Sequence, residues 1–402
     1  MKKVLAAGAA LMLVGSIASA AYAEVNLSGD ARARYIYKDK YDFGNSDQDA
    51  MDYFDSRIRV KVEAKAKGGA FMKARMRFDD IKWDGQGWGA YKEDKNVWVD
   101  YAFIGAPMGP ITLSAGRMPA NFSKFFAWDG RPSRVKIDYK NGGFRLIGFY
   151  DIKDEFVNAN DDLEDNDFTQ IGIVSALKIN DSWSGKVWLG YQNDDREYTG
   201  EVDDAGNAIR RSGDASGFKG AIQLNGKIGT IAIEGGAAYK DADAQGTADD
   251  GFGGYAQVGM KLGAFTPALQ VGFTKDGYVA DNDFGFIMIG AAEPITAINN
   301  VGNKLGDTQW AALIAKATVS ENFKLAANLV YYDIDIDTDG VDVRGVMDAI
   351  EISGSGTYTI SEGADFTVKA GYLSPSYDGR LDSAGVQDDG AFGAYARLAI
   401  KF

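Results

Sequence analysis

The amino-acid sequence predicts an all-β fold, a transmembrane antiparallel β-barrel of 18 strands, and three observations lead to it. Apolar and polar residues alternate along many segments, which is the period of a strand with one apolar and one polar face. Short turns and long polar stretches alternate between these segments, as in barrels with short periplasmic turns and long extracellular loops. After residue 23, no apolar run approaches the length of a membrane-spanning helix, although 46% of the residues are hydrophobic.

The N-terminal segment predicts export from the cytoplasm. It begins with the basic "MKK" and continues with the apolar "VLAAGAALMLVGSIA". Ala21 and Ala23 then supply the Ala-x-Ala spacing of a cleavage site, which completes the pattern of a secretory signal peptide. We therefore expect a signal peptide over residues 1–23 and one barrel over residues 24–402, located in the cell outer membrane.

The strands follow from the alternation, in chain order. The first, Glu24–Tyr37, carries apolar residues such as Leu27 on one face and basic residues such as Arg32 on the other. Eight short turns and nine long stretches then separate eighteen strands. The turns begin at Lys67, Pro107, Asn141, Asn180, Asn225, Gly263, Ser320 and Ser361, and the long stretches span about 38–52, 80–95, 118–133, 153–167, 194–215, 241–251, 276–307, 334–346 and 375–389.

Two points stay open at this stage. A count of 16 strands is the alternative, because strand boundaries read from a pattern shift by a few residues. The apolar stretch Phe284–Asn300 has three interpretations: a further hairpin, a loop folded inward, or a patch against a neighbouring subunit.

The last segment, "AFGAYARLAIKF", predicts how the barrel closes. Its apolar residues share one parity and include the final Phe402, while Arg397 and Lys401 lie on the other. Because a sheet in hydrocarbon can leave no edge unpaired, we expect this strand to pair with the first one. Phe402 would then face outward near Tyr22 or Val25.

Basic residues gather on the inward parity of the first three strands and the last one. Like charges this close repel unless water or counter-ions fill the space between them, so they predict a water-filled lumen. A cationic wall in a narrow channel also enriches anions. This basic wall comprises Arg32, Arg34, Arg57, Arg59, Lys61, Lys65, Lys73, Arg75, Arg77, Arg397 and Lys401, with Asp30, Glu63 and Asp79 as the acids of the same faces.

The net charge of −14 must lie elsewhere, in acidic long stretches such as Asp151–Asp167. Such outer loops can bridge through divalent cations to a lipid surface. "DIDTDG" (Asp335–Gly340) matches the start of a calcium loop, but its twelfth position, where the bidentate Glu belongs, is Val346. We therefore predict no metal site and no cofactor.

The composition also argues against catalysis and nucleic-acid binding. The chain has no histidine and no cysteine, which removes Ser-His and Cys-His nucleophile pairs and disulfides. No carboxylate pair is singled out by its spacing, and no compact basic domain exists. We expect no catalytic residues and no nucleic-acid partner.

Three segments resemble the general porins of Gram-negative bacteria: "YARLAIKF" at the end, "EVNLSGDARARYIY" at the start, and "YAFIGAPMGPITLSAGRMP" over Tyr101–Pro119. The resemblance implies a homotrimer and recognition of Phe402 by the outer-membrane assembly machinery. It also implies a third loop, Met118–Arg134, folded inward to narrow the pore. That loop is acidic in enteric porins, but here it holds Asp129 beside Lys124, Arg131 and Arg134, which puts a cation preference in doubt.

The sequence thus predicts a porin for passive diffusion of small ions and hydrophilic solutes, with a preference for anions. Its expected surroundings are outer-membrane lipid and lipopolysaccharide. The alternative is a structural or adhesion barrel that acts through its acidic extracellular loops.

The signal peptide leads to a first prediction. Cleavage after Ala23 gives a mature chain that begins at Glu24, because Ala-Tyr-Ala directly precedes that residue. Intact-mass spectrometry of the protein from outer membranes should give the mass of residues 24–402. A mass that includes Met1 or Lys2 would refute the assignment.

Overall fold

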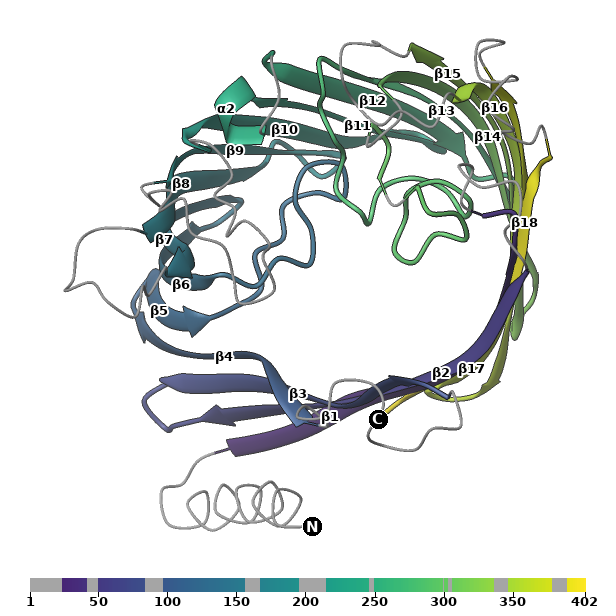
Figure 1. The fold of residues 1–402 in the computed structure, drawn as a ribbon. Coiled ribbons are helices and arrows are strands. Elements are labelled where there is room, and N and C mark those ends of the chain that lie inside the picture. Colours follow the sequence, from purple (N-terminus) through teal and green to yellow (C-terminus); the bar gives the residue numbers. More distant parts are fainter. Residues whose placement is uncertain are drawn as a thin grey trace, which may run out of the picture.

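The protein is a closed antiparallel β-barrel of 18 strands in a computed structural model (Figure 1). The structure describes residues 24–41, 50–83, 97–155, 167–194, 215–245, 249–298, 300–302, 306–335, 346–377 and 389–402. Each strand pairs with its neighbours in the sequence, and β1 also pairs with β18, so the ladder has no open edge. The predicted fold class is confirmed, with 18 strands and not 16.

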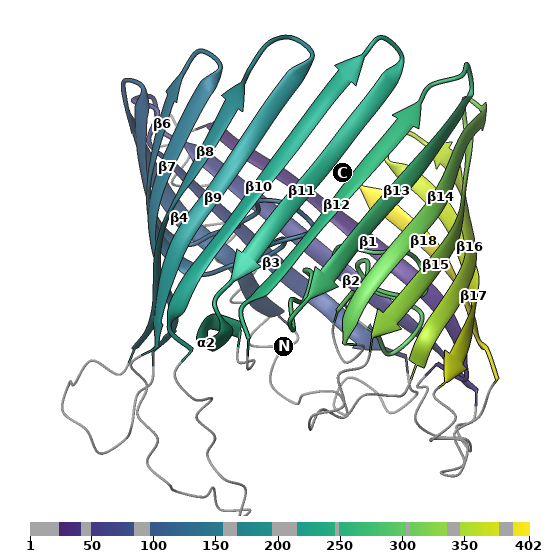
Figure 2. The same cartoon turned by 90° about the horizontal axis from the view of Figure 1, so that it is seen from above.

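The strands lie side by side and tilted, with short turns at one end of the barrel (Figure 2). Their bounds are β1 Glu24–Asp39, β2 Met51–Lys65, β3 Phe71–Lys82, β4 Val97–Met108, β5 Ile111–Arg117, β6 Ser133–Asn141, β7 Phe144–Glu155, β8 Asp167–Lys178, β9 Trp183–Asp194, β10 Gly217–Ile228, β11 Ile231–Lys240, β12 Gly251–Met260, β13 Phe265–Lys275, β14 Asp307–Ser320, β15 Phe323–Asp335, β16 Val346–Ser361, β17 Ala364–Tyr377 and β18 Ala391–Lys401. The short helix α2, Ala242–Gln245, lies between β11 and β12.

One predicted turn is misplaced. The turn between β10 and β11 lies at Gly229 and Thr230, whereas the sequence suggested "NGK" at Asn225. Gly229 adopts a φ of 60°, which suits a glycine in a tight turn. Gly226 stays within β10 and is covered by the ring of Trp183, so there the missing side chain makes room for an aromatic neighbour.

The two faces of the wall have opposite character. Leu27, Ile104 and Ile171 are about three-fifths exposed, although they are large and apolar. Asp151 and Thr308 are buried, although they are polar. This is the reverse of a soluble protein, and it suits a barrel with hydrocarbon outside and a polar lumen inside. Within the described residues, no helix has the length and apolarity to cross a membrane.

The first and last strands close the barrel along a ladder from Asp30 opposite Lys401 to Asp39 opposite Phe392. The N–H of Gly29 donates to the Phe402 carbonyl at 2.7 Å, and the N–H of Phe402 donates to the Gly29 carbonyl at 3.1 Å. The Phe402 ring lies over Gly29, four residues along β1 from the expected neighbour Val25, while the alternative neighbour Tyr22 is outside the described residues. A glycine on the outer face accommodates the ring without displacing the strand.

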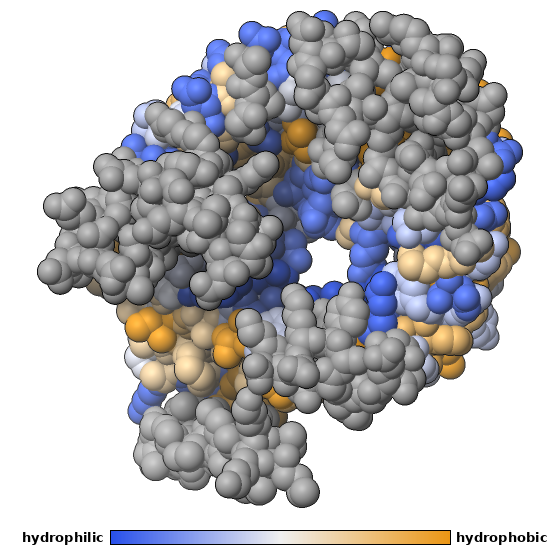
Figure 3. All heavy atoms as spheres, in the orientation of Figure 1, coloured by the Kyte–Doolittle hydropathy of each residue, from blue (hydrophilic) through white to orange (hydrophobic). Residues whose placement is uncertain are grey.

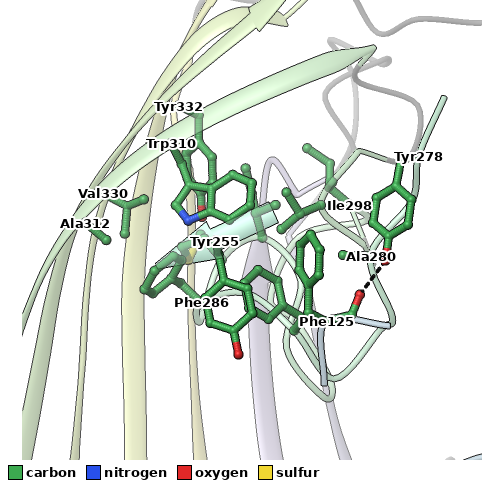
Figure 4. Close-up of a cluster of buried hydrophobic side chains, with 14 of the residues drawn as sticks. Phe125, Tyr255, Tyr278, Ala280, Phe286, Ile298, Trp310, Ala312, Val330 and Tyr332 are labelled. Carbon is green, nitrogen blue, oxygen red and sulfur yellow. Dashed lines mark hydrogen bonds between the residues drawn. The ribbon is translucent and has the colours of Figure 1, made fainter. Parts of the chain in front are cut away.

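Two connections fold into the barrel (Figure 1). Loop L3, residues 118–132, joins β5 to β6, and loop L7, residues 276–306, joins β13 to β14. Phe125 of L3 and Phe284 and Ile298 of L7 belong to one buried cluster with wall residues such as Trp310 (Figure 4). The inward-loop interpretation of Phe284–Asn300 is therefore correct, because its apolar side chains pack against the wall from inside.

Several sequence-based expectations lie outside the described residues. They include the signal peptide over residues 1–23 and the acidic stretch over residues 156–166. Most of the calcium-like motif, residues 336–340, lies there too.

The closing seam leads to a second prediction. Deleting Phe402 removes the ring over Gly29 and two backbone hydrogen bonds at the end of the ladder, while the rest of the ladder stays intact. We expect a large loss of assembled barrel in outer membranes but little change in the melting temperature of the protein that inserts. Replacement of Phe392, an outward aromatic of the same strand, by Ala serves as the control. Wild-type amounts of the deletion variant in the outer membrane would contradict an assembly role for Phe402.

Candidate functional site

The candidate site is the lumen, which Figure 3 shows as an opening bordered by hydrophilic residues. The predicted basic wall occupies β1, β2, β3 and β18 on one side of it. Its side chains point inward, because Arg32 and Arg34 both form ion pairs with Glu293 of the inward loop L7. Arg32 and Arg34 are only 10% and 7% exposed, so this part of the wall is covered by the loop.

The part of the wall that L7 covers is neutralised by acids. The Arg34 guanidinium forms an ion pair with Asp55, which lies opposite it on β2, in addition to the pair with Glu293. Arg32 contacts Glu293 at 2.5 Å. Two arginines therefore share two carboxylates, and the net charge of this group is close to zero.

Two further pairs follow from the strand register. Arg59 lies opposite Asp30 and contacts its carboxylate at 2.8 Å. Glu63 forms ion pairs with Lys61 of the same strand and with Lys73 of β3, the second at 3.2 Å. Side chains directly opposite each other on neighbouring strands meet in this way, so opposite charges there are favourable.

Asp100 is the centre of a third group. The register of β3 against β4 shifts between Arg75 and Met76, and Asp100 is the residue left without an opposite partner. Its buried carboxylate accepts from Arg75 at 2.5 Å and from Arg77 at 3.2 Å. Arg131 of L3 reaches the same carboxylate at 3.2 Å, so Asp100 connects the wall to the constriction loop.

The wall thus holds more acid than the sequence suggested. Asp55, Asp100 and Glu293 were missed: Asp55 shares the inward parity of Arg57, but Asp100 sits at a register shift and Glu293 comes from a distant loop. Arg397 and Lys401 have no carboxylate partner among the residues that the structure describes. They line a hollow of about 360 Å³ together with Arg57 and Arg59.

The other predicted constriction residues differ in burial and in position. Lys124 and Asp129 of L3 are exposed, and Asp129 also accepts from Arg131 at 2.6 Å. The sequence suggested that Arg134 belongs to the loop, but it is the second residue of β6. It is buried and donates to Asp151 of β7 at 2.5 and 2.8 Å, because the two residues lie opposite each other in the ladder.

The inward loops hold each other. The backbone N–H of Trp128 in L3 donates to the Asp281 carboxylate of L7 at 2.9 Å. The Tyr278 hydroxyl of L7 donates to the Phe125 carbonyl of L3 at 2.9 Å (Figure 4). Burial raises the pKa of Asp281, although the N–H groups of Trp128 and Asp283 oppose that shift. Burial also raises the pKa of Tyr278 well above its usual value, so this hydroxyl remains a donor.

A buried glutamate fixes the tip of L7 to the barrel. Glu351 of β16 is fully buried and accepts from the Met288 N–H at 3.1 Å. The hydroxyls of Ser353 and Tyr332 also donate to it, at 2.6 and 3.2 Å. These bonds compensate a carboxylate that is surrounded by apolar side chains, and they hold the loop tip against the wall.

Further basic residues line the lumen across from the predicted wall. They surround a cavity of about 750 Å³ between L3 and strands β6–β11. Lys186 donates to the Phe122 carbonyl at 2.6 Å and so supports L3 from below. Alternation could have assigned these residues to the lumen, since they share the inward parity, but they are dispersed over the sequence. The cavity is lined by Arg134, Lys136, Arg145, Lys153, Lys186, Lys219 and Lys240, among others.

An open barrel with a polar lumen, narrowed by loops that fold into it, defines a channel protein of the outer membrane. The chain belongs to the Gram-negative porins, because the sequence profile of that family matches residues 7–378. The porin assignment made from the sequence is thereby confirmed.

Solved structures agree with this fold at low sequence identity. OprD of Pseudomonas aeruginosa is similar with a TM-score of 0.62 and 10% identity, over 94% of this chain and 95% of that chain. OpdK of the same organism is similar with a TM-score of 0.62 and 9% identity, over 94% of this chain and 98% of that chain. No curated protein sequence matches significantly. The similarity to solved structures therefore supports the fold alone.

The contact between the loops leads to a third prediction. Asp281→Ala removes the acceptor of the Trp128 N–H, a loss of about 1–3 kcal/mol. Asp281→Asn keeps an acceptor and removes a charge that burial disfavours. We expect noisier single-channel currents in the alanine variant and a wild-type trace in the asparagine variant.

Asp283→Ala is the matched control, since it removes a carboxylate two residues away and keeps the backbone N–H that bonds Asp281. Equal noise in the two Asp281 variants would show that charge, and not the hydrogen bond, holds the loops together.

Proposed function

We propose that the barrel is a channel for passive diffusion of small hydrophilic solutes and ions across the outer membrane, and that it favours anions. The observation that carries the preference is the excess of inward-facing cations over acids on the described strands. Arg397 and Lys401 on one side, and the lysines of the 750 Å³ cavity on the other, contribute charge that the ion pairs do not cancel.

The ion pairs refine which cations matter. A paired arginine and carboxylate present a small net charge to a passing ion, whereas an unpaired cation presents its full charge at short range. Arg59, paired with Asp30, should therefore contribute less than Arg397 or Lys401. Charges at the mouth lie in bulk-like water and are screened beyond about 8 Å at physiological salt.

Lys401 and Asp30 provide a fourth prediction, because they lie directly opposite each other on β18 and β1. Lys401→Gln removes an unpaired cation, whereas Asp30→Asn releases Arg59 from its ion pair. The two variants change the net charge in opposite directions at neighbouring positions. In planar bilayers under a KCl gradient, the reversal potential should move toward cations in the first variant and toward anions in the second.

Both shifts should be larger at low salt, where the Debye length is about 30 Å at 0.01 M against about 3 Å at 1 M. Lys324→Gln, an exposed lysine at the start of β15, controls for the loss of any one lysine at this end. A cation-selective wild type, or shifts of the same sign in the two variants, would overturn the anion preference.

The alternative function is a structural or adhesion barrel that acts through its acidic extracellular loops. Liposome swelling separates the two functions, because only an open channel admits small sugars. The resemblance to general porins also supports a homotrimer embedded in lipid and lipopolysaccharide. Mass photometry of the protein extracted in mild detergent would give the number of chains.

A further inference from the structure

Two lysines face each other at one point of the lumen wall. Lys219 of β10 and Lys240 of β11 are direct partners in the antiparallel register, so their side chains leave the sheet side by side. Both line the same 750 Å³ cavity. Like charges directly opposite each other on neighbouring strands destabilise a sheet, so this arrangement calls for a compensating group.

A third lysine approaches the pair from β7. The Lys219 side-chain nitrogen lies close to that of Lys153, and Lys240 is its second basic neighbour. Lys153 lies at a register irregularity of β7 against β8 and donates to the Gln192 side-chain oxygen at 3.0 Å. The Gln192 amide donates in turn to the Ala244 carbonyl at 2.9 Å and to the Ala215 carbonyl, so its oxygen is held toward Lys153.

Lys219 lacks a compensating acid in the part of the chain that the structure describes. Only Lys153 and Lys240 act on its charge there. Lys240, in contrast, has partners in L7. It donates to the Val279 carbonyl at 2.9 Å, and Asp281 is the acid that acts on its charge. Among the described residues that line the cavity, the acid is Asp151, and it is engaged by Arg134. Lys219 therefore faces the cavity with no described acid beside it, and an anion bound there would supply the missing counter-charge.

The chemistry of the donors selects the ligand. Lysine presents a compact charge with three donors, whereas arginine matches planar carboxylates through two parallel bonds. Three lysines converging from three strands fit a group with several equivalent oxygens and more than one charge. We propose that Lys153, Lys219 and Lys240 form a binding site for a phosphate group, either inorganic phosphate or the phosphate of a small organic ester.

The site deepens the proposed function, on which it rests, because it names an anion class that would pause in the channel. Phosphate held there should obstruct the chloride current. We therefore expect inorganic phosphate, added at about pH 8 where it is mostly a dianion, to reduce single-channel chloride conductance in a saturable way. Lys219→Gln and Lys240→Gln should each raise the half-blocking concentration about tenfold, since each removes one charge-assisted hydrogen bond.

Lys316→Gln is the matched control, because Lys316 also faces the lumen but lines a different hollow, beside the short turns. It should leave the half-blocking concentration unchanged. Glycerol phosphate and succinate complete the set of ligands. Block by glycerol phosphate identifies esters as ligands of the same site, whereas block by succinate as strong as that by phosphate would overturn the selection for phosphate.

The absence of block in the wild type, or equal loss in Lys316→Gln, would also overturn the site. The unblocked chloride conductance of each variant shows that the barrel has folded, and two independent lysine variants guard against the failure of one. The reversal potential in KCl alone measures the anion preference. A wild type that is anion-selective without phosphate block would therefore reject the site and leave the proposed function standing.

Discussion

The structure depends on one constraint: in hydrocarbon every backbone N–H and C=O needs a partner within the protein. The ladder meets it by closing β18 onto β1, and the terminal pair of hydrogen bonds between Gly29 and Phe402 completes the seam. Closure in turn forces one side of every strand toward an enclosed space. The alternation of side chains then decides that apolar groups meet lipid and polar groups meet the lumen.

The two inward loops lie within this enclosed space, and they pack against its wall mainly through apolar side chains. Phe125, Phe284 and Trp310 form an aromatic cluster against the inner wall, and Glu351 fixes the tip of L7 through its backbone. The lumen is therefore divided into a dry part, where L3 and L7 meet the wall, and an open part bordered by charges. Where the loops pack against the wall, the inward-facing positions of β15 hold Val330 and Tyr332 and not charged residues.

The fold was predictable from the sequence because closure imposes a repeating pattern on the whole chain. The positions of the long connections followed from the alternation of short turns with long polar stretches, and the pairing of the two ends followed from the need to close the sheet. The ion pairs were less accessible. Arg34 with Asp55 could be derived from register, but Asp100 lies at a register shift and Glu293 arrives from a loop about 260 positions away along the chain. Alternation carries no information on either.

These missed acids change how the charge of the lumen should be understood. A bare basic wall would repel itself, and L7 relieves part of that repulsion because it brings Glu293 to Arg32 and Arg34. L3 instead adds a third arginine, Arg131, to the Asp100 carboxylate that two wall arginines already share. Neutralisation by a loop is thus concentrated where L7 touches the wall. Arg397 and Lys401, which have no carboxylate partner among the described residues, line a hollow to which no described residue of L7 contributes. The same contacts that narrow the pore therefore determine which charges a passing ion encounters at full strength.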